Sequence, residues 1–156
     1  MSGRITAATW LLLLAGGVGA QEPDRPSLLT PPWGGYAPNL AVAISARTLS
    51  LVDSLGHFDR LDWDGFLEST SLARTMSESR RSELGCVQAR QLAVAEDIDY
   101  VLCGMVLRGR EGLQVEAALW DIAGNEASYF TSRPTNSRDT LVEEVLRQIR
   151  AWQPPP

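Results

Sequence analysis

The stretch that decides the fold is CVQARQLAVAEDIDYVLCGMVLRGREGLQVEAALWDIAGNEASYF, residues 86–130. Residues 86–96 space their apolar side chains at helical intervals and predict a helix. Residues 99–107 are apolar on both alternating faces, which is typical of a central strand covered on each side. Residues 113–122 alternate apolar with polar side chains and predict a half-exposed strand, joined to the previous one by a hairpin. Residues 126–131 complete an antiparallel meander.

Several elements are predicted upstream of this stretch. The apolar run at residues 40–46 (LAVAISA) predicts a buried strand. Residues 48–55 predict a helix that ends at Gly56, since glycine is the usual stop signal. Residues 58–61 suit a second short strand, and residues 63–75 are ambiguous between helix and strand.

Two further helices are predicted, and together with the strands they indicate the fold class. Residues 76–84 predict a polar helix that ends at Gly85. Residues 140–152 carry an apolar stripe and predict a helix opened by a capping box of Thr140 and Glu143. The sequence therefore predicts an α/β fold of the α+β type, with a mixed, largely antiparallel sheet of about four to five strands packed with about three to four helices.

The N-terminus has the layout of a signal peptide, residues 1–20. One arginine precedes an apolar stretch over residues 7–15, and Val18 and Ala20 supply the small side chains that signal peptidase accepts. We therefore expect cleavage before Gln21 and a periplasmic or secreted mature protein without membrane insertion. The alternatives are an uncleaved anchor or a core helix, but the apolar run meets glycines before it reaches the roughly 20 residues of a spanning helix.

The signal is followed by residues 21–39, a segment rich in proline and glycine. Its preferred interpretation is an extended, disordered leader. The alternative is a polyproline segment that offers Trp33 and Tyr36 to a partner or packs them on the domain. Residues 40–153 are expected to form a single domain, and residues 154–156 a proline tail that cannot extend the last helix.

The two cysteines are expected to pair, because exported proteins favour disulfides. At the helical rise, Cys86 lies about 15 Å from the end of its predicted helix. Along the following strand, Cys103 lies about 13 Å from the strand's start, so the two sulfurs reach the same level. We predict a Cys86–Cys103 disulfide that stabilises the fold by about 3 kcal/mol. The alternative is a pair of buried free thiols.

The sequence carries no convincing catalytic or metal-binding pattern. His57 is the one histidine, which excludes a histidine metal cluster, and GxSxG, HExxH and glycine-rich phosphate loops are absent. Asp62 and Asp64 form the one candidate carboxylate pair, a pattern that is more often a solvated rim. The net charge of -5, or -6 once Arg4 is removed, disfavours nucleic-acid binding. We expect no enzyme activity, no metal and no cofactor.

Within residues 86–130, the residues that carry a family likeness are Ala89, Arg90, Leu92, Ala93, Asp99, Tyr100, Val101, Gly104, Asp121 and Gly124. This pattern resembles the N-terminal domain of the translocation protein TolB and its relatives. The same fold type occurs in the curli secretion lipoprotein and in the lipoprotein activators of penicillin-binding proteins. The resemblance therefore implies an envelope assembly or adaptor module, and it speaks to fold more than to function.

These observations predict a non-catalytic interaction module that binds another envelope protein. Aromatic side chains are favoured anchors at interfaces, so the candidate surface consists of Trp120, Tyr129, Trp33 and Tyr36. The rival interpretation is a small-ligand or cell-wall glycan-binding protein that uses a groove between the sheet and residues 63–66. The sequence is also compatible with a homo-oligomer.

Overall fold

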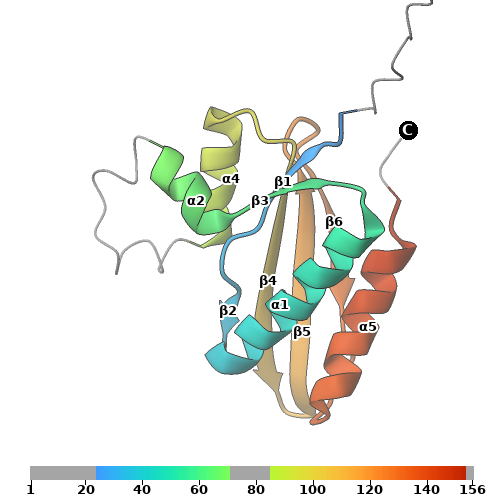
Figure 1. Ribbon diagram of the computed structural model, residues 1–156. Coiled ribbons are helices and arrows are strands. Elements are labelled where there is room, and N and C mark those ends of the chain that lie inside the picture. Colours follow the sequence, from blue (N-terminus) through green and yellow to red (C-terminus); the bar gives the residue numbers. More distant parts are fainter. Residues whose placement is uncertain (1–23, 71–84, 154–156) are drawn as a thin grey trace, which may run out of the picture.

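The computed structural model describes residues 24–70 and 85–153, which form six strands and four helices (Figure 1). The strands are β1 (Ser27–Leu29), β2 (Gly34–Gly35), β3 (Asp59–Leu61), β4 (Tyr100–Gly109), β5 (Gly112–Asp121) and β6 (Glu126–Thr131). The helices are α1 (Pro38–Leu55), α2 (Trp63–Ser69), α4 (Cys86–Ala95) and α5 (Arg138–Ala151). The predicted α/β class is confirmed, and the helix predicted at residues 76–84 lies outside the described residues.

The described strands form one sheet in the order β3-β1-β4-β5-β6, and β2 pairs with β4 further along that strand. β4 pairs antiparallel with β5 along its whole length, and β5 pairs antiparallel with β6. The short strands β1, β2 and β3 run parallel to their partners. The predicted three-strand meander is therefore confirmed, and β4 is the strand to which most of the others attach.

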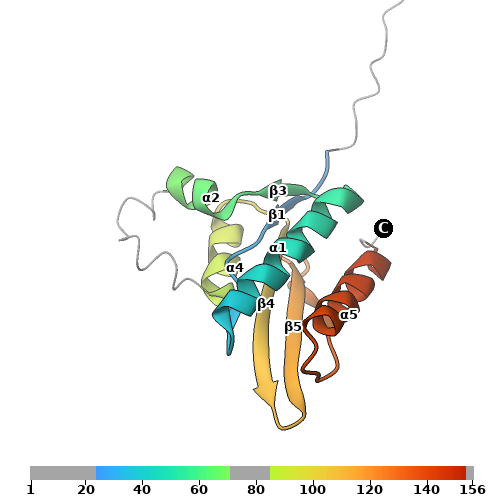
Figure 2. The same cartoon turned by 60° about the horizontal axis from the view of Figure 1, so that its bottom comes forward.

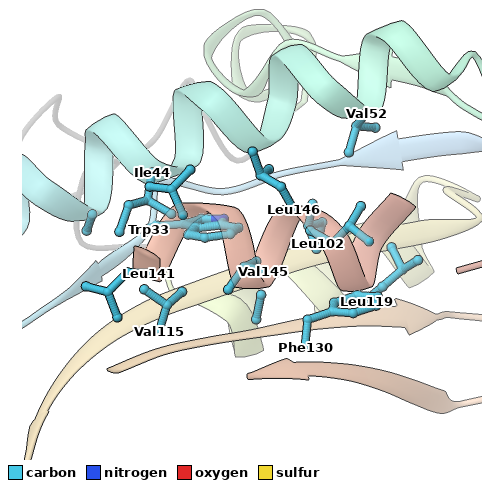
Figure 3. Close-up of a cluster of buried hydrophobic side chains, with 14 of the residues drawn as sticks. Trp33, Ile44, Val52, Leu102, Val115, Leu119, Phe130, Leu141, Val145 and Leu146 are labelled. Carbon is cyan, nitrogen blue, oxygen red and sulfur yellow. The ribbon is translucent and has the colours of Figure 1, made fainter. Parts of the chain in front are cut away.

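Helices cover both faces of the sheet. α1 and α5 lie side by side on one face (Figure 1), where Ile44 and Val145 belong to the first core cluster (Figure 3). α2 and α4 pack on the other face, where Leu67 belongs to a second core cluster. β4 supplies buried side chains to both clusters, Leu102 to the first and Val101 to the second. The prediction that both faces of β4 are covered is therefore confirmed for residues 101–103, whereas Met105, further along the strand, is 46% exposed.

Part of the expected leader belongs to the sheet. The preferred interpretation of residues 21–39 as a disordered linker is wrong for the described part, because β1 and β2 lie there. Leu28 and Leu29 of β1 are fully buried, one in each core cluster. Ser27 is fixed to Asp99, because its N–H and hydroxyl donate to Asp99 Oδ2 at 2.7 and 2.8 Å and its Oγ accepts from the Asp99 N–H at 2.9 Å.

The strand predicted at residues 40–46 is wrong, because these residues form part of α1, a helix of 18 residues. Its buried side chains share one helical face and are Ala41, Ile44, Ser45, Thr48 and Val52. Pro38 lies in the first turn, where its missing N–H costs no helical hydrogen bond. Gly56 ends the helix in the left-handed conformation, with φ at 66°, at the predicted stop.

The predicted capping box at Thr140 is also wrong. Helix α5 begins at Arg138, and its N-cap is Ser137, whose Oγ accepts from the Thr140 N–H. The short strand predicted at residues 58–61 is confirmed as β3. In residues 24–70 and 85–153, no helix is long and apolar enough to cross a membrane.

Candidate functional site

Helix α4 covers only part of the second sheet face. Its ten residues span about 15 Å at the helical rise, whereas the ten residues of β4 or β5 span about 33 Å. Figure 2 shows the β4–β5 hairpin extending beyond the helix. The described residues leave Met105, Glu116 and Tyr129 exposed, with Ala118 half-buried beside them, and we call these four residues the open face. The strand register places Met105 opposite Glu116 and Ala118 opposite Tyr129.

Trp120 continues this surface toward α4. Its ring lies edge-on to the ring of Tyr129, with 6.4 Å between the centroids. The guanidinium of Arg90 lies 3.5 Å from the centroid of the Trp120 ring and donates to Asn125 Oδ1 at 3.2 Å. Trp120 is thus held between two neighbours, while Tyr129 is 69% exposed. A fixed ring beside an exposed one is a rigid aromatic anchor of the kind that interfaces favour.

The other two candidate residues do not join this surface. Trp33 is only 4% exposed and lies over Gly104, in the first core cluster. Its side chain therefore packs on the domain, which was one of the alternatives for the leader. Tyr36 is 53% exposed, but it lies beside Arg108, whose guanidinium carbon is 4.7 Å from the ring centroid. Of the four predicted surface residues, the structure brings Trp120 and Tyr129 together.

A cavity of about 430 Å³ lies on the open face. Residues 32–35 bound it on the β2 side, Gly85 and Cys86 bound it at the start of α4, and Tyr129 bounds it on the β6 side. Its size is within the roughly 300–1,000 Å³ of typical ligand pockets. Sequence reasoning missed Met105 and Glu116, although the register of the predicted β4–β5 hairpin could have placed them side by side.

The predicted disulfide is present. The Cys86 and Cys103 sulfurs are 2.01 Å apart, with 5.6 Å between the Cα atoms. The bond joins the first residue of α4 to the middle of β4, and both cysteines line the cavity. The disulfide therefore fixes the position of α4 at one end of the open face.

The region around the candidate carboxylate pair has a structural role. Asp62 is the N-cap of α2 and accepts from the Gly65 N–H at 2.9 Å. Trp63 is buried in the second core cluster, with its ring stacked on Phe66 at 6.4 Å between centroids. Trp63 thus packs against the sheet instead of lining a groove. The described residues hold no group of three or more His, Cys, Asp and Glu side chains suited to a metal ion.

No protein family and no curated protein matches the chain. Among solved structures, the chain is similar to the LpoB C-terminal domain from Escherichia coli, with 14% identity over 74% of this chain and 89% of that one and a TM-score of 0.50. It is also similar to the lipoprotein GNA1162 from Neisseria meningitidis, with 20% identity over 80% and 96% of the two chains and a TM-score of 0.48. TolB from Acinetobacter baumannii matches at 13% identity and a TM-score of 0.47, over 81% of this chain and 26% of that one. The predicted resemblance is thus confirmed as one of fold, and the fold is that of the LpoB C-terminal domain.

Proposed function

We propose that this chain is a non-catalytic interaction module of the cell envelope, periplasmic or secreted, which binds another envelope protein through the open face and Trp120. The single observation that carries the proposal is the part of a sheet face that residues 24–70 and 85–153 leave uncovered, on which the exposed ring of Tyr129 is backed by Trp120. Exposed aromatic side chains on a rigid support are favoured as anchors of protein interfaces.

Two further observations support a location in the envelope. The sequence begins with a predicted signal peptide, and the Cys86–Cys103 disulfide suits an oxidising compartment. The TolB resemblance, carried by residues 86–130, implies an envelope adaptor.

Site-specific photo-crosslinking tests this function. We would place p-benzoylphenylalanine at Tyr129 in the tagged protein, irradiate the cells of its own host, and identify adducts by mass spectrometry. The matched control places the same group at Tyr36, which is also exposed but lies outside the open face. We expect an adduct with one envelope protein from position 129 and none with that protein from position 36.

A substitution tests whether the same residue contributes binding energy. We expect Tyr129→Ala to weaken co-purification of the crosslinked protein at least about fivefold, or about 1 kcal/mol, as for the minority of interface residues that contribute most to binding. Val42→Ala, at an exposed position of α1 on the other side of the sheet, is the control and leaves binding unchanged. Equal adducts from positions 129 and 36, or no envelope adduct at all, would contradict the proposal.

The cavity favours a second candidate function, a small-ligand or cell-wall glycan-binding protein. Its volume of about 430 Å³ is that of a ligand pocket. A ligand that binds the native state raises the unfolding temperature by mass action. A thermal-shift screen with cell-wall fragments tests this function, and Ala118→Trp, which fills the cavity, should abolish any shift.

A further inference from the structure

The open face carries one carboxylate beside its apolar cavity. Glu116 projects from β5 on the same face as Ala118, with Met105 opposite it on β4 and Thr131 opposite it on β6. Its side chain is exposed, and no ion pair involves it among the described residues. The open face is therefore negatively charged at Glu116, and no ion pair from the described part of the chain neutralises this carboxylate.

Apart from the indole N–H of Trp33 and the hydroxyl of Tyr129, the other side chains that line the cavity are apolar. Met105 is 46% exposed and lies opposite Glu116, and Ala118, two residues after Glu116 on β5, lies opposite Tyr129. Among the described residues that line the cavity, Glu116 is the one charged side chain, and the hydroxyl of Tyr129 is the one other side-chain oxygen. The cavity thus combines a largely apolar lining with a single carboxylate.

We propose that this cavity binds a lysine side chain of the partner protein, with its aliphatic stem along Met105, Ala118 and Tyr129 and its ammonium group at Glu116. This inference rests on the proposed function and names the chemistry that the partner presents. Lysine combines a four-carbon apolar stem with a compact cation that stays partly hydrated, so it suits a largely apolar lining with one exposed carboxylate.

The alternatives fit less well. Arginine has five donors in a rigid fork, and most would lack a side-chain acceptor in this cavity. An acidic side chain would be repelled by Glu116, and an aliphatic one would leave that carboxylate without a counter-charge.

Titration with pentylammonium as a probe for the lysine side chain tests the inference on the full mature protein. Amide NMR shifts of Ala118 and Tyr129 report binding, with 1-pentanol and pentanoate as the neutral and anionic analogues at equal, low ionic strength. We expect pentylammonium to bind up to about fivefold more tightly than 1-pentanol, since an ion pair with one exposed carboxylate adds a modest attraction. Pentanoate should bind more weakly than either.

Two variants, each of which removes one negative charge, decide whether Glu116 causes the preference for pentylammonium. Glu116→Gln should remove the preference for pentylammonium over 1-pentanol, while Glu111→Gln, in the turn between β4 and β5, should retain it. The inference is overturned if 1-pentanol binds as tightly as pentylammonium, or if Glu116→Gln keeps the preference. Such a failure would leave any crosslink from position 129 intact, so it is distinguishable from a failure of the proposed function.

Discussion

Replacing Gly104 by alanine should destabilise the fold severely, because the ring of Trp33 occupies the space that a side chain would need. A Cβ at position 104 would lie 2.2, 2.3 and 2.4 Å from three ring carbons of Trp33, and ordinary carbon contacts are about 3.5 Å or more. Forced overpacking of a core costs about 1–3 kcal/mol, and loss of a buried aromatic ring about 3–5 kcal/mol. We therefore expect Gly104→Ala to lower the free energy of unfolding by about 2–4 kcal/mol.

Urea unfolding followed by circular dichroism, with the disulfide intact, measures this effect. Gly34→Ala is the matched control, because a Cβ there would meet no atom within 4 Å, and its free energy should change by less than about 0.5 kcal/mol. In a Trp33→Ala background, Gly104→Ala should lose most of its cost, since the clash is then removed. A change below about 0.5 kcal/mol for Gly104→Ala in the wild-type background would refute the reasoning.

Three other predictions concern the disulfide and two polar side chains of α5. Reducing the disulfide, which links residues 17 positions apart, should lower the free energy of unfolding by about 3 kcal/mol in urea titrations. Gln148→Ala should cost about 1–2 kcal/mol by the same assay, because its carboxamide donates to the Thr131 carbonyl at 2.7 Å and accepts from the Thr131 N–H at 3.1 Å. The pKa of Glu144 is lowered, first by the hydrogen bond from the Arg133 backbone N–H and then by the Arg133 guanidinium. The ionised Glu144 therefore stabilises the fold at pH values above the pKa of an unfolded glutamate. This contribution is lost as the pH falls through the lower pKa of the folded state. An NMR titration should show this depressed pKa, and Arg133→Ala should reverse it only in part; an undepressed value would contradict the assignment.

The parts of the fold that follow from sequence are those with long and clear periodicity. β4 is a near-continuous apolar run of ten residues and β5 alternates apolar with polar side chains over ten residues, so their pairing could be predicted. The apolar run at residues 40–46 was wrongly predicted to be a strand. Val42 and Ile44 are β-branched, and the run is too short for its pattern to distinguish a strand from a buried helix. In the structure Ile44 is buried and Val42 is 60% exposed, as expected for a helix that shows one face to the core.

The sequence did not predict strand β1, for a different reason. It is three residues long and lies between Pro26 and Pro31, so neither alternation nor composition marks it as a strand. Its burial depends on a tertiary contact, the pairing with β4, which no local pattern encodes.

The candidate site was predictable in part. Trp120 and Tyr129 could be placed on one sheet face from the meander, and the structure confirms that they are neighbours. The burial of Trp33 could not be predicted, because it depends on the absence of a side chain at Gly104, on a strand remote in sequence.

The position of β1 in the sheet has a consequence for how the protein is made. β1 is the first strand along the chain, yet it lies between β3 and β4, and the Ser27–Asp99 contact that joins it to β4 spans 72 residues. During synthesis, β1 therefore leaves the ribosome long before β4 exists, and Leu28 and Leu29 remain without their core. Closing such a distant pair is slow, and exposed apolar segments aggregate in the meantime. β1 therefore cannot pair in the sheet until residues 100–101, its partners in β4, have emerged.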